Sequence, residues 1–409
     1  MSQRHEVVVL ALSSQTDGGG RINVRELCRR RKVSPKTLYK WVKRYKQGGF
    51  EALADRSRKP RSSPGRTGDA DEARVVALRQ EHPAWGGRKI SRRLADLAGA
   101  DDAAGEVRVP APSTVTGILR RHGLLDPEQS DKHTPITRFE RERPNDLWQM
   151  DFKGHFPLAG SGAAGPRCHP LTVLDDHSRF CVGLRACCDE RERTVRSELA
   201  ALFRAYGLPA CVLCDNGPPW GWDEPWCHTI LSAWLIRLGI VVTHGRPRHP
   251  QTQGKDERFH RTLKAEVLGG AAGRVFDGPA HAQREFDGWR DVYNLSRPHE
   301  ALALATPATR YRPSPRPYPE ELPPIEYGPG DAVRKVNKDG YFGYKGGWYK
   351  VSQAFARQPI AVRRPDDGAD DGGDDALMDV FYCGQKVARI DVRRRKRVWP
   401  PWPPADKTP

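Results

Sequence analysis

Carboxylates stand at three places where an apolar run meets a polar position. Asp151 interrupts "WQMDFKGHF", Asp215 ends the apolar part of "VLCDNGPPWGW", and "QGKDERFHRTLK" offers Asp256 and Glu257. Burying a lone carboxylate is costly unless something compensates its charge. Acids brought together raise one another's pKa values, and a divalent cation relieves that repulsion. Oxygen ligands of this kind suit Mg²⁺, with Mn²⁺ as an alternative, and two such ions can assist phosphoryl displacement.

Glu257 is the third acid that the sequence favours. A helix is expected from about residue 252. Besides Glu257, this helix carries Asp256 and, further on, Glu266. At about 100° per residue, Asp256 falls within the apolar stripe of this helix, whereas Glu257 projects away from it. The stripe consists of Phe259, Leu263 and Val267. Spacing alone leaves a second interpretation open, in which Asp151 and Asp215 are hydrogen-bonded structural acids.

Basic side chains on the same helix are expected to hold DNA phosphates beside the acids. They are Lys255, Arg258, Arg261 and Lys264. Charged donors of this type form strong hydrogen bonds to phosphate and position a nucleic acid without reading its sequence.

Charge is concentrated near the N-terminus. The chain has 409 residues, a net charge of +17, and 17 Lys and Arg against 5 Asp and Glu within residues 1–68. Such an excess favours a polyanionic partner over a merely solvated surface. "EVVVLAL" is too short for a membrane span, and no signal peptide is recognised. The nine cysteines follow no disulfide framework, which predicts reduced thiols in a cytosolic protein. The expected location is cytoplasmic and nucleoid-associated.

The first 130 residues predict two helical units. Val24 to Arg31 forms one short helix, and "KVSPKTLYKWVKRY" forms the next, with Ser34 as N-cap and Pro35 at the first helical position. A short helix, a turn and a basic helix are typical of a helix-turn-helix. The DNA-contacting residues expected on the basic helix are Lys36, Lys40, Lys43 and Arg44. After an Arg/Pro/Ser-rich linker, helices are expected over 73–81, 85–97 and from Ser113.

From about Pro144 the pattern changes to an α/β layer and then to short strands. Strands are expected at "DLWQMDF", "HPLTVLDD", "FCVGLRACC" and "ACVLCD", followed by one at 240–243. Helices are expected at "ERERTVRSELAALFRAYG" and over 226–238. The strands after residue 325 predict a small β-barrel or sandwich. The aspartate-rich "PDDGADDGGDDALMD" is interpreted as a solvated loop and not as a calcium site, because its aspartates do not have the ligand spacing of a calcium-binding loop. Cys211 and Cys214 form a C-x-x-C without a convincing second pair, so buried strand cysteines are favoured over zinc.

The motifs together resemble the catalytic core of DDE-type insertion-sequence transposases related to retroviral integrases. The resemblance is carried by "WQMDFKG", "LCDNGPPW", "RPRHPQTQGKDERFHRTLKAE" and "YNLSRPHEAL", with "HPAWGGRKI" in the second helical unit. It implies an RNase H-like fold in which Asp151, Asp215 and Glu257 are the metal-binding triad. "VLDDHSRF" matches the second strand of the family, where Asp175 and Asp176 are not triad members.

Two features depart from the family pattern. Between Asp215 and Glu257 lie 41 residues, more than the usual interval, and "PPWGWDEPW" looks like the insertion. Cys214 stands where Ser or Thr usually precedes Asp-Asn-Gly. The zinc-binding N-terminal domain of retroviral integrases is also absent, and Trp220 and Trp222 are interpreted as loop packing rather than as base-stacking residues.

The resulting prediction is a multidomain protein with all-α helix-turn-helix units, then an α/β RNase H-like core, then a small all-β domain. The expected boundaries are a helix-turn-helix domain 1–58, a linker 59–69, a second helix-turn-helix domain 70–130, the catalytic core 131–310, a Pro-rich connector 311–324, a β-barrel domain 325–395 and a disordered tail 396–409.

The predicted function is that of a DNA transposase. It would bind the terminal inverted repeats of a mobile element, hydrolyse the phosphodiester there with Mg²⁺, and transfer the strand to target DNA as a homo-oligomer. The sequence leaves open whether a helper ATPase takes part. The alternative is a transposase-derived, sequence-specific DNA-binding regulator without catalysis.

Overall fold

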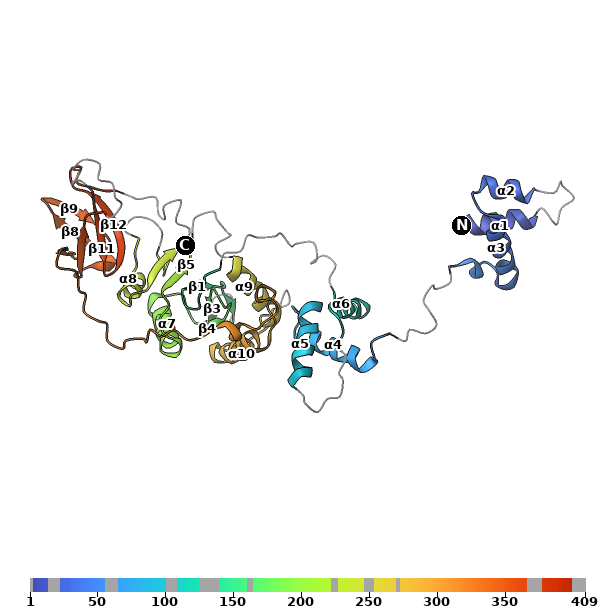
Figure 1. Ribbon diagram of the computed structural model, residues 1–409, viewed down its shortest axis with the longest axis horizontal. Helices are drawn as coiled ribbons and strands as arrows, with labels where there is room; N and C mark the ends of the chain where they lie inside the picture. The colour runs from blue at the N-terminus through green and yellow to red at the C-terminus, as the bar shows by residue number, and fades with distance from the viewer. Residues whose placement is uncertain are drawn as a thin grey trace. The chain divides into compact units, whose positions relative to one another are not determined.

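The computed structural model describes residues 3–13, 23–55, 65–100, 109–125, 140–159, 165–221, 227–245, 254–269, 273–365 and 377–398. The chain forms two compact units, Met1–Arg66 and Thr67–Pro409 (Figure 1). None of the helices in these ranges is both long and apolar enough to cross a membrane.

The first unit is a small helical domain. Its elements are α1 (Gln3–Ser13), α2 (Val24–Arg30), α3 (Pro35–Gly48) and the short 3-10 turn η1 (Glu51–Leu53). The Ser34 hydroxyl accepts a hydrogen bond from the Thr37 amide, which confirms Ser34 as the N-cap of α3. The buried core between the helices consists of Val7, Val8, Leu27, Cys28, Leu38 and Leu53.

The second unit begins with three helices, α4 (Asp69–Glu81), α5 (Gly87–Ala100) and α6 (Pro112–Arg121). They share one core of Val75, Trp85, Ile90, Leu94, Val115, Ile118 and Leu119. Helix α4 begins four residues before the expected Ala73. Its first turn contains Asp69, Asp71 and Glu72, and acidic side chains interact favourably with the positive end of a helix dipole.

The α/β core is built on a mixed sheet. Its strands are β1 (Leu147–Phe152), β2 (Phe156–Pro157), β3 (Arg167–Asp175), β4 (Cys181–Cys187), β5 (Cys211–Cys214) and β6 (Val241–His244). The order is β4-β3-β1-β5-β6, and β2 also pairs with β3. Strand β1 is antiparallel to β3 and parallel to β5, which is parallel to β6. Every strand expected from the sequence is therefore present.

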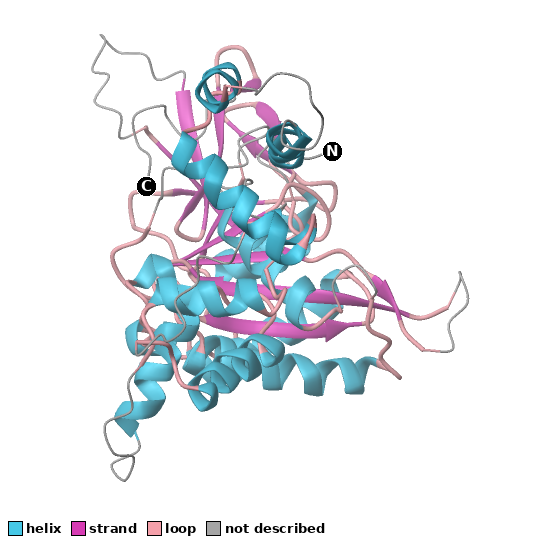
Figure 2. Ribbon diagram, turned by 90° about the vertical axis from the view of Figure 1, so that its right-hand side faces the viewer, coloured by secondary structure: helices cyan, strands magenta, loops and turns pink. Residues whose placement is uncertain are grey.

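Helices cover both faces of this sheet, where Figure 2 shows them in cyan against the magenta strands. They are α7 (Glu192–Tyr206), α8 (Ile230–Arg237), α9 (Gly254–Glu266) and α10 (Pro279–Asp291). Side chains alternate along a strand. Val173 therefore packs in the cluster that contains the buried residues of α7 and α8, and Leu174 packs in the cluster of α9 and α10.

Short segments complete the second half of the core. They are η4 (Val292–Ser296), η5 (Glu300–Leu302) and α11 (Pro307–Arg310). Helix α8 is shorter than the expected range 226–238 because a capping box at Thr229 and Ser232 sets its start. Residues 222–226 lie outside the described part of the chain.

The C-terminal region is all-β. Its elements are β7 (Ala332–Lys335), β8 (Tyr341–Tyr344), β9 (Gly347–Lys350), η6 (Gln353–Phe355), β10 (Pro359–Arg363), β11 (Leu377–Tyr382), β12 (Gln385–Asp391) and β13 (Lys396–Val398). The strands form an antiparallel sheet of order β13-β12-β11-β10-β7 and a separate β8–β9 hairpin. The expected disordered tail 396–409 begins too early, because Lys396–Val398 pair with β12. Residues 399–409 lie outside the described part.

The Pro-rich connector and the C-terminal sheet are both tied to the core. The Arg316 guanidinium donates to the carbonyls of Pro209, Leu238 and Gly239. The Gln385 side-chain amide both donates to and accepts from the backbone of Val242 on the edge strand β6. One hydrophobic cluster runs from the mixed sheet of the α/β core into the C-terminal sheet.

Candidate active site

Asp151 and Asp215 lie side by side because their strands are parallel neighbours in register. Met150 of β1 is the partner of Cys214 of β5, so the next residue on each strand emerges at the same end of the sheet. Neighbouring strands are about 4.8 Å apart. Asp151 alternates with Trp148 and Met150, which pack on the α7–α8 side, so the Asp151 side chain projects toward α9.

The two carboxylates perturb each other. Burial, followed by the nearby charge of Asp215, raises the pKa of Asp151 to about 7. The Asp151 side chain is 22% exposed, so the carboxyl group still reaches solvent. A divalent cation between two such acids would relieve this repulsion.

Helix α9 presents two acids in different ways. Asp256 is buried, and its Oδ1 has no hydrogen-bond partner among the described residues. Burial, and then the charges of Asp151 and Asp215, hold the pKa of Asp256 well above its usual range. Glu257 is exposed. The helix phase expected from the sequence is confirmed, because Phe259 and Leu263 are buried.

The donor chemistry here fits a divalent metal ion, but the structure shows no formed metal centre. Among the residues that the structure describes, no group of three or more His, Cys, Asp or Glu side chains could hold a metal ion. Asp151 and Asp215 nevertheless lie at the same end of neighbouring strands, and their charges act on the buried Asp256, whose Oδ1 has no hydrogen-bond partner among the described residues. Such all-oxygen sets suit Mg²⁺ or Mn²⁺.

His260 connects α9 to the strand of Asp151. The Thr172 hydroxyl donates to the Asp151 carbonyl at 2.9 Å, so it accepts from His260 Nε2, also at 2.9 Å. Burial lowers the pKa of His260 to about 3, so its imidazole is neutral. Its Nδ1 then carries a lone pair, 3.7 Å from Asp151 Oδ2. The sequence pattern alone indicates no role for His260 beyond its place in the motif.

The Asp-Asn-Gly turn is attached to strand β6. The Asn216 side chain donates to the Gly245 carbonyl at 2.7 Å, and His244 Nδ1 lies 3.1 Å from the Asp215 carbonyl oxygen. Burial lowers the pKa of His244, which favours the neutral ring as hydrogen-bond donor to that carbonyl. These contacts fix the backbone that carries Asp215. Trp220 is buried against Phe152, as expected for loop packing, and Trp222 lies outside the described residues.

The four cations expected to hold phosphates fall into two groups. Arg258, Arg261 and Lys264 are exposed, and Arg258 lies 3.5 Å from Glu300. Lys255 differs from expectation: its ammonium forms an ion pair with the fully buried Asp176. A sequence pattern gives no signal for this contact, because the partners are 79 residues apart.

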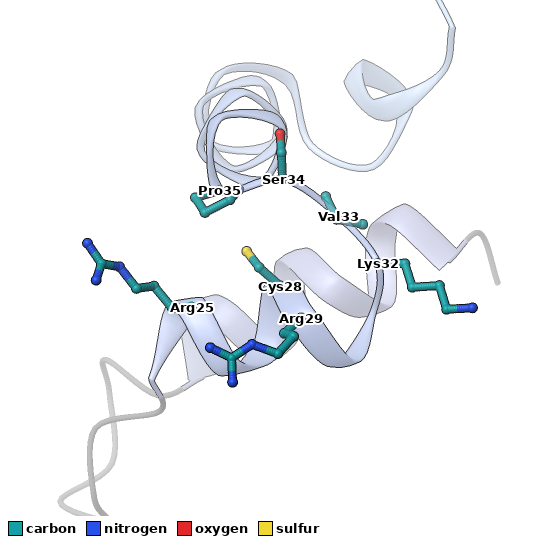
Figure 3. A pocket seen from close by; sticks show the side chains of 7 residues that line it. All are labelled: Arg25, Cys28, Arg29, Lys32, Val33, Ser34 and Pro35. Carbon is teal, nitrogen blue, oxygen red and sulfur yellow. The ribbon is translucent and has the colours of Figure 1, made fainter.

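The helix-turn-helix of the first unit carries exposed basic residues. Lys36, Lys40 and Lys43 are exposed on α3, whereas Arg44 is half-buried and donates to the Ala54 carbonyl at 2.6 Å. A shallow hollow lies at the turn between α2 and α3 (Figure 3). Its lining includes Arg25, Cys28, Arg29, Lys32, Val33, Ser34 and Pro35. The α3 N-terminus thus faces a basic surface.

Family models match most parts of the chain. A helix-turn-helix domain matches residues 3–61, and a homeodomain-like domain matches residues 37–119. Two integrase core domain models match residues 141–250 and 238–307. The C-terminal domain of the IS481 family transposases matches residues 331–398. These matches confirm the expected fold class of helical domains, an RNase H-like core and an all-β region.

Curated relatives include proteins of insertion elements. An uncharacterized 39.2 kDa protein of the insertion element IS476 from Xanthomonas euvesicatoria is 29% identical over 53% of this chain and 71% of its own length. A 31.7 kDa protein of the insertion element IS407 from Burkholderia multivorans is 27% identical over 40% of this chain, which spans about half (54%) of that relative.

Solved structures with some likeness are retroviral. A simian T-cell lymphotropic virus intasome structure has a TM-score of 0.34 at 16% identity, over 80% of this chain and 99% of that chain. The catalytic core domain of BIV integrase has a TM-score of 0.29 at 21% identity, over 40% and 92%. Scores this low add nothing to the assignment. The chain therefore carries helix-turn-helix domains, an integrase core domain and a C-terminal domain of the IS481 transposase type, and it is similar to insertion-element proteins.

Proposed function

We propose that this protein is a transposase, which binds the ends of a mobile element, hydrolyses the phosphodiester at each end, and joins the freed 3′-hydroxyl to target DNA. The observation that carries the proposal is the pair Asp151 and Asp215. Strand pairing brings them together at one end of the sheet, where burial and mutual repulsion raise the pKa of Asp151 to about 7. A hydrogen bond from the Phe152 backbone and the charge of Lys153 offset this rise only in part.

In this proposal Asp151, Asp215 and Glu257 hold Mg²⁺, or Mn²⁺ in its place. When bound, such ions would supply activation of the attacking oxygen and stabilisation of the leaving oxygen. The two strand acids are fixed by the sheet, and Glu257 comes from α9, which packs on the side to which Asp151 projects.

Exposure favours Glu257 over Asp256 as the third acid. DNA must approach from solvent, and Glu257 is exposed on the same side of α9 as Arg261 and Lys264. Asp256 is buried beneath that surface, among the apolar residues of the helix. Its proximity to the strand acids makes it the rival assignment.

The other residues of the site orient the acids and the DNA. His260 and Thr172 hold the backbone of Asp151, and Asn216 holds the turn of Asp215. The exposed Arg258, Arg261 and Lys264 are available as donors to phosphate oxygens. They would fix the backbone near the acids without selecting a sequence.

DNA end recognition falls to the helix-turn-helix domains in this proposal. The exposed lysines of α3 lie on the helix that would enter the major groove. Because the two ends of an element must be held side by side for transfer to the same target, the protein would act as a homo-oligomer on DNA. Its partners would be the terminal inverted repeats and target DNA.

The test uses the full chain with duplexes that carry the inverted repeats flanking its reading frame. Wild-type protein with Mg²⁺ should nick at the element end and join that end to a plasmid, and EDTA should stop both reactions. Asp215→Asn should bind the same duplex with wild-type affinity and give no nicked or joined product. If wild-type protein binds the repeat specifically but gives no product with Mg²⁺ or Mn²⁺, the alternative of a DNA-binding regulator replaces the proposal.

A further inference from the structure

Asp176 is a fully buried carboxylate in the turn that follows β3. It accepts a hydrogen bond from the backbone amide of Arg141 at 2.8 Å and one from the side chain of Gln149 at 2.7 Å. Its third partner is the Lys255 ammonium. The Asp176 side chain is 0% exposed, and the Lys255 side chain is 18% exposed. A buried ion pair offsets its desolvation only when its geometry is good and further hydrogen bonds satisfy the charges. Asp176 has those hydrogen bonds.

The partners of Asp176 come from the two elements that carry the proposed acids. Gln149 is two residues before Asp151 on β1, so both side chains project from the same face of the strand. Lys255 is two residues before Glu257, in the first turn of α9. One buried carboxylate therefore ties the strand of the first acid to the helix of the third.

Lys255 is poorly placed to bind DNA. Its ammonium already faces a carboxylate that is closed off from solvent, whereas Arg261 and Lys264 of the same helix are exposed. A phosphate contact by Lys255 would leave Asp176 buried without its cation, which is an unfavourable exchange.

We infer that Lys255 is a positioning residue, which through its ion pair with Asp176 sets the first turn of α9 against β1 and thereby places the third acid beside Asp151. The inference rests on the proposed function, because it presumes that α9 carries an acid of the active site. It replaces the phosphate-binding role that the sequence suggested for Lys255.

The experiment compares full-length Lys255→Met, Lys255→Arg and the double variant Lys255→Met/Asp176→Asn with wild type. Lys264→Met is the matched control, an exposed lysine on the same helix. Three quantities are measured: the affinity for element-end DNA as a function of salt, the Mn²⁺-induced rise in melting temperature, and the joining rate at saturating DNA. The double variant leaves no unpaired buried charge, so it keeps the test valid if Lys255→Met fails to fold.

Positioning predicts that Lys255→Met and the double variant bind DNA with wild-type affinity and salt dependence. Their Mn²⁺-induced stabilisation should shrink, and joining should slow by about 100-fold, the effect expected of small misplacements of reacting groups. Because both changes break one contact, the double variant should join no more slowly than Lys255→Met. Lys255→Arg, which keeps the charge, should recover part of the rate.

The opposite pattern overturns the inference. If Lys255→Met weakens DNA binding and lowers the salt slope by about 0.9, as Lys264→Met should, then Lys255 contacts phosphate. A wild-type Mn²⁺ response in the double variant would equally refute a positioning role. Absence of joining in wild-type protein would count against the proposed function alone, since the DNA and Mn²⁺ measurements do not depend on turnover.

Discussion

Replacing Asp151 by asparagine is expected to stabilise the metal-free protein near neutral pH, although active-site changes are usually tested only for lost activity. The pKa of Asp151 rises from 3.8 to about 7 in the folded protein, first through burial and then through the charge of Asp215. Between these two values the folded state binds more protons than the unfolded state. Wild-type stability therefore falls as pH rises through that window.

The size of the effect follows from the shift. It spans about three pKa units, and each unit corresponds to about 1.4 kcal/mol, so ionised Asp151 costs the folded state at most about 4 kcal/mol. Asparagine cannot ionise and keeps nearly the same shape. The stability difference between Asp151→Asn and wild type should thus be small at about pH 4 and grow until about pH 7, reaching between about 1 and about 4 kcal/mol.

Urea unfolding in EDTA at several pH values measures this difference. The control is Asp189→Asn, because Thr194 Oγ1 and the Arg191 amide donate to Asp189 and lower its pKa. The control should lose stability at every pH above the usual Asp range. Added Mg²⁺ should then stabilise wild type but not Asp151→Asn. A stability difference for Asp151→Asn that does not change between about pH 4 and about pH 8 would refute the electrostatic description of the site.

Three further outcomes follow from packing and charge. Leu263→Ala should destabilise the core by about 2–5 kcal/mol because Leu263 is fully buried. Lys264→Ala should change stability by less than about 0.5 kcal/mol but should impair end joining. Equal losses of melting temperature in the two variants would show that the helix phase is wrong. Glu266→Ala should cost about 3–5 kcal/mol in urea unfolding because it leaves the buried Arg297 without its 2.6 Å partner, and a loss below about 1 kcal/mol would contradict that pairing. Lys40→Ala should lower the salt slope of end binding by about 0.9 if α3 contacts phosphate, and an unchanged slope would place α3 away from the backbone.

The sequence was sufficient for features that depend on local patterns. A short apolar run of β-forming residues predicted the strand that carries Asp151, and the 3.6-residue period predicted that Leu263 is buried while Glu257 is exposed. Ser34 followed by Pro35 predicted the start of α3. Each of these depends on a few neighbouring residues, so no tertiary information was needed.

Features that depend on the packing of distant segments could not be predicted. The pairing of Lys255 with Asp176 joins residues 79 positions apart, and its burial depends on how α9 lies on the sheet. The closeness of Asp256 to the strand acids has the same origin. Strand β13 was missed because Lys396–Val398 sit in a strongly basic segment, and only pairing with β12 makes them a strand.

The central claim is that the acids at the ends of β1 and β5 act with Glu257 on DNA. The most direct measurement is the joining of a preprocessed element end to plasmid DNA by wild type, Glu257→Gln and Asp256→Asn with Mg²⁺, alongside their affinities for the end. Glu257→Gln should bind the end normally and give no joined product, while Asp256→Asn should retain joining. Joining by Glu257→Gln together with its loss in Asp256→Asn would move the third acid by one residue. Joining by both variants would contradict the assignment of a third acid to the first turn of α9.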